Sequence, residues 1–208
     1  MEALNNSDIR HKRIFNLIAP VYGLLNGYVK NHFRDAIHTV QSVVDIEGKN
    51  ILDIGTGTGA WAVLFKEKGA SGVHGLDFAE KMIQIANSKY GNNIKFSIAD
   101  AQNLKECTDG SYDIVTASFV LHGVNKKRRE KILLEMKRIS NDLVIIHDYY
   151  GRTGPLIHFL EQLEKSDYIN FKNDFYSELS NYFPHVLRKK VSNGRAIYFA
   201  SKSRELEN

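Results

Sequence analysis

The sequence predicts an α/β fold in which one mostly parallel sheet is covered by helices on both faces. From residue 50 onward, short β-branched runs alternate with longer segments of helical periodicity, a pattern that is typical of βαβ units. Near the end of the chain, two apolar runs flank Asn193-Gly194, a pair that readily adopts the positive φ values of a tight turn. Because two residues cannot join parallel strands, the closing hairpin must be antiparallel.

Each element follows from its own pattern. Residues 126–139 show the clearest helical signal, because Ile132, Leu133 and Met136 recur at helical spacing and Asn125 can cap the first turn. Two further helices are expected over 60–68 and 79–89. The seven expected strands are 51–54, 72–76, 94–98, 112–117, 143–147, 186–191 and 196–200.

The two ends of the chain differ from this alternating core. Residues 8–45 have no strand signal and are expected to form two helices, broken around Pro20 and Gly23. The insert before the hairpin is rich in aromatic residues, and helix packing is the favoured interpretation of that stripe. We therefore expect a single domain, 1–208, made of a helical lid (1–48), a core (49–150), an insert (151–184) and the hairpin (185–202).

Composition narrows the class of protein. Hydrophobic residues make up 43% of the chain and charged residues 25%, which favours a soluble, cytoplasmic globular protein. The single cysteine, Cys107, excludes an internal disulfide and a cysteine-built zinc site, and no metal is expected. The net charge of +4 does not call for a nucleic acid. The basic runs 126–129 and 188–190 are interpreted as solvated surface; RNA or an anionic membrane surface is compatible with them but not implied.

A glycine-rich turn is the strongest functional signal. Residues 53–59, Asp-Ile-Gly-Thr-Gly-Thr-Gly, run from a buried strand directly into a helix. Glycines at 55, 57 and 59 allow a tight turn and let a ligand approach where a Cβ would collide. The spacing also fits the dinucleotide fingerprint of Rossmann-like folds, so this loop alone does not choose between cofactors.

Three carboxylates restrict the kind of cofactor that this loop could bind. Asp53 lies within an apolar strand, where it is costly unless it meets donors or a cation. Asp77 ends the second strand, where a carboxylate can accept from both ribose hydroxyls; a turn-forming role is the alternative. Asp100 ends the third strand, either to contact an adenine amino group or to cap a short helix. Three acids with no phosphate-binding Lys or Arg in this loop region suit a cationic ligand without phosphates.

This combination resembles the class I S-adenosylmethionine-dependent methyltransferases over residues 10–202. The resemblance implies S-adenosylmethionine as cofactor, S-adenosylhomocysteine as product, and in-line methyl transfer to a small-molecule acceptor. Residues 13–26 are similar to the lid segment of the ubiquinone/menaquinone C-methyltransferases, with Gly23 in place of the usual acid after Tyr22. The cofactor-binding residues that it implies are Tyr22, Asp53, Gly55, Thr56, Gly57, Gly59, Asp77, Phe78, Met82, Asp100, Ala101, Ser118 and Phe119.

Candidates for chemistry follow the fourth and fifth strands. His122 lies just beyond the fourth strand and could deprotonate an acceptor, although packing against the next helix is the more common role of such a histidine. His147, Asp148, Tyr149 and Tyr150 form either a hydrogen-bonding rim or a solvated loop. No Asn/Asp-Pro-Pro-aromatic motif follows the fourth strand, so methylation of DNA bases is not expected.

Two other functions remain open at this point. An NAD-dependent oxidoreductase would share the glycine loop, but it explains neither Asp53 nor the closing hairpin. A non-catalytic RNA-binding or partner-binding protein that keeps the fold would account for the basic C-terminal third, but not for the intact loop and its three acids. Methyl transfer explains the glycine loop, its three acids and the closing hairpin together.

Overall fold

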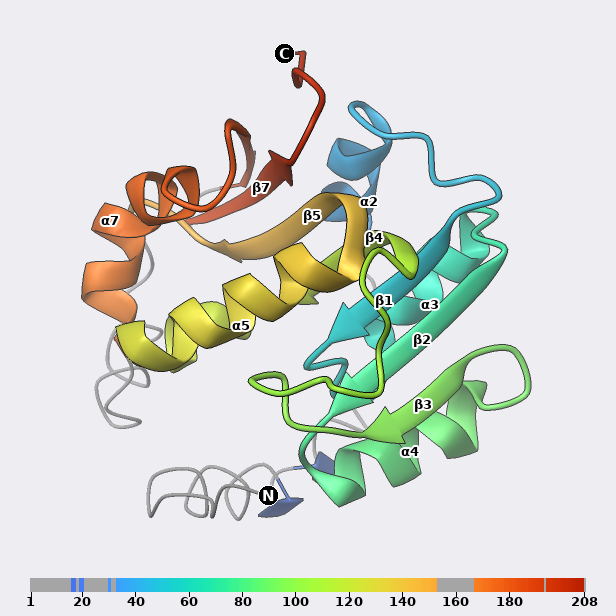
Figure 1. Ribbon diagram of the computed structural model, residues 1–208. Helices are drawn as coiled ribbons and strands as arrows, with labels where there is room; N and C mark the ends of the chain where they lie inside the picture. Colours follow the sequence, from blue (N-terminus) through green and yellow to red (C-terminus); the bar gives the residue numbers. More distant parts are fainter. Residues whose placement is uncertain are drawn as a thin grey trace.

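A computed structural model describes residues 16–17, 19–20, 30, 33–152, 167–192 and 194–207. All seven predicted strands are present (Figure 1). The strands are β1 (Asn50–Ile54), β2 (Gly72–Asp77), β3 (Lys95–Ile98), β4 (Tyr112–Ser118), β5 (Ser140–Tyr149), β6 (His185–Ser192) and β7 (Arg195–Ser201). The helices are α2 (Arg34–Gln41), α3 (Ala60–Glu67), α4 (Glu80–Tyr90), α5 (Lys126–Ile139) and α7 (Tyr168–Ser180), with a short 3-10 helix, η1 (Leu121–Gly123).

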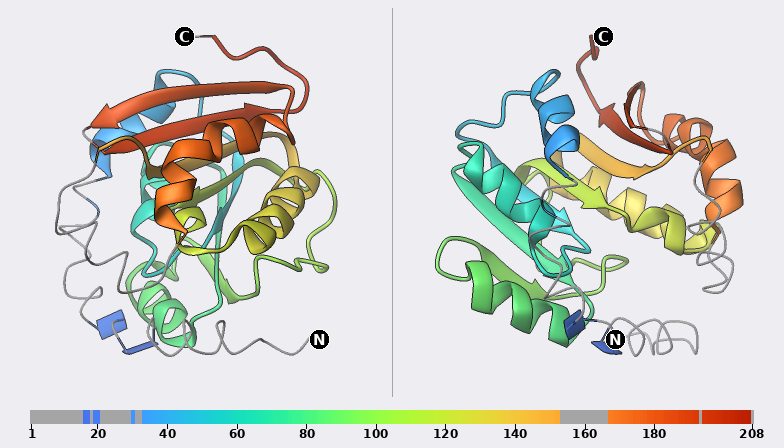
Figure 2. Two further views of the ribbon diagram at one scale, coloured as in Figure 1. Left: turned by 90° about the vertical axis from the view of Figure 1, so that its left-hand side faces the viewer. Right: turned by 180° about the vertical axis from the view of Figure 1, so that it is seen from behind.

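The strands form one sheet in the order β3-β2-β1-β4-β5-β7-β6. The first five strands run parallel, and β7 is antiparallel to both β5 and β6. The predicted fold class is therefore confirmed, including the hairpin, in which Gly194 has a φ of 82°. The hairpin and the strand pair β2–β3 lie toward opposite sides of the molecule (Figure 2).

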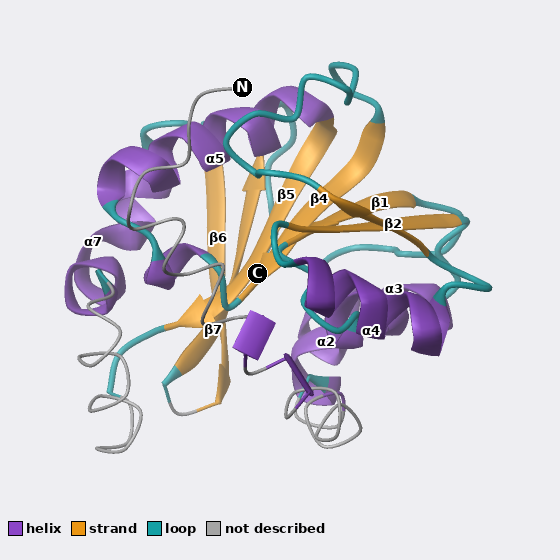
Figure 3. Ribbon diagram, turned by 90° about the horizontal axis from the view of Figure 1, so that it is seen from below, coloured by secondary structure: helices purple, strands orange, loops and turns teal. Residues whose placement is uncertain are grey.

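Helices cover both faces of the sheet, as Figure 3 shows for α2, α3 and α4 on one side and α5 and α7 on the other. Each face has its own apolar core. Adjacent residues of β1 alternate between the two cores, with Ile51 in one and Leu52 in the other, and both are fully buried. This explains why the central strands are continuous apolar runs without polar alternation.

The strand β5 is longer than its sequence pattern predicts. It begins at Ser140, directly after α5, and continues to Tyr149. His147 and Asp148 are consequently fully buried within the strand, and the interpretation of this segment as a solvated loop is wrong. The C-terminal extension arises because β7 pairs with β5 from Leu143 to Tyr149, where Tyr149 lies opposite Arg195, and at the other end Ser140 pairs with Tyr112 of β4.

Some predictions fall on residues outside the described ranges. These include Tyr22, most of the expected N-terminal helices, residues 153–166 of the insert, and Asn193 in the hairpin turn. Within the described part of the insert, α7 buries Phe171 and Phe175 against the sheet, which agrees with the interpretation of its aromatic stripe as helix packing.

Candidate functional site

The glycine loop between β1 and α3 has the backbone conformation that its sequence predicts. Gly55, Gly57 and Gly59 all have positive φ, at 69°, 53° and 82°. The amide of Thr56 donates to the carbonyl of Leu76 at the end of β2, which ties the loop to the neighbouring strand. The loop therefore lies at the carboxyl edge of the sheet, where open α/β sheets bind their ligands.

Two of these glycines serve different purposes. A Cβ on Gly55 would lie 2.4 Å from Cγ2 of Val120, the residue that precedes η1, so this glycine lets two loops pack together. A Cβ on Gly57 would meet no atom of the described residues within 4 Å. As far as these residues are concerned, the space beside Gly57 is open, and it offers a ligand close access to the loop backbone.

Asp77 fixes the loop from the end of β2. Its Oδ2 accepts the amide of Gly57 at 2.9 Å, and its Oδ1 accepts the amide of Ala79 at 2.8 Å. Burial raises the pKa of this carboxyl group, and the backbone amides of Ala79, Gly57 and Phe78 oppose that rise. Asp77 therefore shapes the turn, while remaining at the position where the sequence predicts a ribose-binding acid.

Asp53 differs from Asp77 because neither of its oxygens has a hydrogen-bond partner among the described residues, although its side chain is almost fully buried. Burial raises the pKa of Asp53 to about 7; the nearby Thr56 hydroxyl opposes this rise without a bond of normal geometry, and Asp77 adds to it. A buried carboxylate in this state is costly unless a ligand supplies a cation or donors. Asp53 is the strongest indication of a ligand at this edge.

The remaining predicted cofactor residues lie at or after the carboxyl ends of β1, β2, β3 and β4, or in α4. Asp100 does not cap a helix: its Oδ1 accepts the amide of Gln102 in a turn, and Arg128 Nη2 lies 3.7 Å from the same oxygen. Met82 is buried and packs with Ala19 and Ala79. Thr56 is also buried, whereas the half-buried members of the set are Phe78, Ala101, Ser118 and Phe119.

These residues fit S-adenosylmethionine, the cofactor that the sequence resemblance implies. The unpartnered Asp53 carboxylate suits a positively charged group, and the open space at Gly57 admits a ligand close to the backbone. Asp77 already has two amide donors, so a ribose would share its oxygens with the loop. Among the residues that the structure describes, no cluster of three His, Cys, Asp or Glu side chains could hold a metal ion.

The neighbouring part of the edge contains His122 in η1. Its Nδ1 lies 2.7 Å from Oδ1 of Asp148 in β5, and both side chains are buried. Phe119 lies between β4 and η1 with a φ of 54°, the one positive value among the described non-glycine residues. The structure thus brings together the candidates that follow β4 and those that end β5.

The structure corrects the expectation for one residue of this region. Arg129 belongs to the basic run 126–129, which the sequence predicts to be solvated surface, yet Arg129 is only 2% exposed. Its guanidinium binds Glu178 of α7. The burial of Arg129 can be inferred from the sequence, because Arg129 lies one helical turn before Ile132 and Leu133, on the same buried face of the helix as Met136.

Comparison with known proteins agrees with this geometry. Residues 51–142 match the model of the methyltransferase domain family. Two demethylmenaquinone methyltransferases, from Thermotoga maritima and Thermus thermophilus, are 32% and 36% identical over 132 residues, or 61% of this chain. The chain spans only 55% and 59% of these two curated relatives. A solved magnesium protoporphyrin IX methyltransferase from Synechocystis PCC 6803 shares the fold, with a TM-score of 0.56 and 17% identity over 98% of this chain and 90% of that one.

The fold is Rossmann-like, with a glycine loop at the carboxyl edge of the parallel strands. Over residues 51–142 the chain is similar to the methyltransferase domain family, and the two curated relatives that it resembles are methyltransferases. None of the described helices has the length and apolar character that crossing a bilayer requires.

Proposed function

We propose that this chain transfers a methyl group from S-adenosylmethionine to a small-molecule acceptor and leaves S-adenosylhomocysteine as product. The observation that carries the proposal is the Asp53 carboxylate, which is buried beneath the glycine loop with no hydrogen-bond partner among the described residues. A cationic cofactor without phosphates would meet this acid, whereas a pyrophosphate would be repelled by Asp53 and Asp77 together.

The chain's own residues would hold the cofactor and align it. The Asp77 carboxylate would accept from the ribose hydroxyls, and Asp100 would face the adenine side. Ser118 and Phe119, at the end of β4, would border the reacting methyl group. When bound, the cofactor supplies an electrophilic methyl on a sulfonium, so the protein contributes chiefly alignment and the exclusion of water.

The acceptor is proposed to be a planar, menaquinone-like small molecule. Two features support this. The relatives that match over 61% of the chain carry the name demethylmenaquinone methyltransferase. In addition, the edge beyond β4 is aromatic: the ring of Tyr149 lies 5.0 Å from that of Phe119 and 4.7 Å from that of His122. Aromatic side chains favour planar apolar ligands.

Labelled methyl transfer tests the proposal. The full chain is incubated with methyl-labelled S-adenosylmethionine and either a metabolite extract or reduced demethylmenaquinone. We expect label to enter an organic product, with one S-adenosylhomocysteine formed for each methyl transferred. Label that enters only the extract would support methyl transfer and reject the menaquinone-like acceptor. Label that enters RNA, or no product at all, would contradict the proposed function.

A further inference from the structure

His122 and Asp148 form a buried pair that the binding of a cofactor does not require. The Nδ1 atom of His122 lies 2.7 Å from Oδ1 of Asp148, and the two residues are 7% and 0% exposed. They come from η1 and β5, so the pair joins the loop after β4 to the next strand. Polar pairs of this kind are costly to bury, and their presence beside a ligand site indicates a role in its chemistry.

Asp148 is held so that it orients the imidazole. Its Oδ2 accepts the amides of Leu121 at 3.1 Å and His122 at 3.3 Å, and its Oδ1 accepts the amide of Tyr149 at 2.8 Å. Because this carboxylate accepts all of these donors, it also accepts the proton of His122 Nδ1. The neutral imidazole then has its lone pair on Nε2, which makes Nε2 its basic nitrogen.

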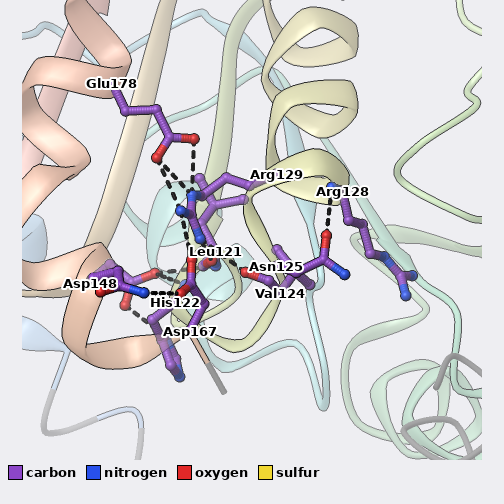
Figure 4. A network of polar contacts seen from close by, with 10 residues as sticks. Leu121, His122, Val124, Asn125, Arg128, Arg129, Asp148, Asp167 and Glu178 are labelled. Atoms are coloured by element: carbon purple, nitrogen blue, oxygen red, sulfur yellow. Dashed lines mark hydrogen bonds and ion pairs between the residues drawn. The ribbon is translucent and has the colours of Figure 1, made fainter. Parts of the chain in front are cut away.

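A second buried group fixes η1 from the other side (Figure 4). Arg129 Nη1 donates to the carbonyl oxygens of Leu121 at 3.2 Å and Val124 at 2.8 Å, the residues on either side of the His122 turn. The remaining donors of Arg129 bind Glu178 and Asp167. The backbone of η1 is thus held between Asp148 and Arg129, which leaves the histidine ring little freedom to turn away.

The segment that leads into η1 lies against the glycine loop. Val120, two residues before His122, occupies the space that a Cβ on Gly55 would need. Phe119 adopts a positive φ there, and its ring lies 6.2 Å from that of His122. Strained backbone of this kind persists where a functional geometry is maintained by its surroundings. Val120 packs against Gly55 of the glycine loop, and only Leu121 separates Val120 from His122 in the sequence.

The other histidine of this edge is unsuited to taking up a proton. His147 is fully buried and is surrounded by the rings of Phe33, Trp61 and Phe119. Burial, with a smaller effect of Arg195, lowers the pKa of His147 to about 3. Among the described residues it has no carboxylate partner comparable to Asp148, and its Nδ1 lies 3.1 Å from the Ser118 hydroxyl. Of these two histidines, His122 is therefore the one suited to accept a proton.

We propose that His122 is the general base of this site, with Asp148 as its positioning residue, and that the acceptor is protic, carrying a hydroxyl, enol or amine proton that must leave. His122 Nε2 takes the proton, and the electron pair of the broken bond makes the acceptor nucleophilic toward the methyl. The electron pair of the carbon–sulfur bond stays on sulfur. The positive charge lost there is balanced by the imidazolium, which Asp148 stabilises.

This inference rests on the proposed function, but its test has a separate readout. Para-nitrophenol is added to the full chain together with S-adenosylhomocysteine, below the probe's own pKa. Its absorbance reports whether the bound form is phenol or phenolate. We expect the wild-type protein to bind it as phenolate, and the phenolate signal to fall at least about tenfold in His122→Asn. The matched control is His38→Asn, on the exposed face of α2, which should behave as the wild type does.

Nitrogen NMR of the free protein tests the positioning role of Asp148. We expect neutral His122 to carry its proton on Nδ1, and Asp148→Asn to weaken that preference together with the phenolate signal. A wild-type protein that binds S-adenosylhomocysteine but leaves the probe's spectrum unchanged overturns the proposal. So does a full phenolate signal in His122→Asn, or a neutral His122 protonated on Nε2. Failure to bind S-adenosylhomocysteine instead contradicts the proposed function.

Discussion

Asp53 is a carboxylate that the fold buries at a cost to its own stability. In the unfolded chain its pKa is near that of a free carboxyl group, whereas burial raises the pKa of Asp53 to about 7 in the folded protein. Between these values the folded state binds more protons than the unfolded state, so stability falls as pH rises and the penalty is complete above the folded pKa. Such a cost at a ligand site is typical of residues kept for binding.

The variant Asp53→Asn should therefore be more stable than the wild type without ligand. We expect the gain to be small near the unfolded pKa and to grow to roughly 2–4 kcal/mol above the folded pKa. Denaturant unfolding at several pH values measures it, with the exposed Asp174→Asn as control. The same variant should bind S-adenosylmethionine more weakly. A constant stability difference across this pH range would show that Asp53 does not titrate as described.

The position of Asp53 can be predicted from the sequence, but the lack of hydrogen-bond partners for its carboxylate among the described residues cannot. A carboxylate inside an apolar run is visible as an anomaly, and the structure confirms that it is buried. That both of its oxygens lack a hydrogen-bond partner among the described residues depends on how the glycine loop lies over β1, which no local pattern encodes. The His122–Asp148 contact was hidden for a similar reason, because its partners are 26 residues apart.

Among the elements, α5 was placed correctly but its first turn was not. Asn125 caps it as predicted, accepting the amide of Arg128 at 3.0 Å, and the helix ends at Ile139. The basic residues in the first turn of α5 differ in burial, since Lys127 is exposed and Arg129 is buried. Their charge predicts exposure to solvent for both, whereas the helical spacing from Ile132 predicts that Arg129 lies on the buried face. Periodicity was the better guide because it reports which face a residue lies on.

Arg129 joins α5, η1 and α7 through all five of its guanidinium donors. Nε and Nη2 bind Glu178, Nη2 also binds Asp167, and Nη1 binds two carbonyl oxygens. We expect Arg129→Ala to lower the free energy of unfolding by about 3–5 kcal/mol, because it leaves Glu178 buried without its cation. Lys127→Ala, at an exposed position two residues before Arg129 in α5, should change the free energy of unfolding by less than about 0.5 kcal/mol.

A double-mutant cycle separates the ion pair from simple loss of packing. Once Arg129→Ala has been made, adding Glu178→Ala should cost little or restore some stability, because it removes the uncompensated charge. Denaturant unfolding of the four proteins gives the coupling. Strictly additive effects would mean that the Arg129–Glu178 contacts do not act as a pair.

At the scale of the whole molecule, charge is divided along the chain. Residues 51–120 carry 6 Lys or Arg and 8 Asp or Glu, and they include Asp53, Asp77 and Asp100, the three acids that we propose for the cofactor. Residues 121–208 carry 16 and 11, but several of these cations make internal contacts. Besides Arg129, Arg188 stacks on Tyr150 at 4.1 Å and on Tyr176 at 5.1 Å. The basic excess of the C-terminal third is therefore only partly available to a partner.

The sheet topology explains why the fold was predictable and the acceptor was not. Alternating strands and helices, the glycine loop and the hairpin are local signals, and all three appear where the sequence places them. The acceptor side that we propose would be built from η1, the end of β5 and α7, which contact one another only in the folded chain. The contacts that suggest its chemistry are therefore seen only in the structure.

Calorimetric titration with S-adenosylhomocysteine and with NAD, side by side, tests the central claim most directly. We predict saturable binding of one S-adenosylhomocysteine per chain and no binding of NAD. Asp77→Ala should weaken that binding strongly, because it removes the predicted ribose contact and releases the amides of Gly57 and Ala79, whereas exposed Asp35→Ala should not. Binding of NAD without S-adenosylhomocysteine, or unchanged affinity in a folded Asp77→Ala variant, would contradict the account.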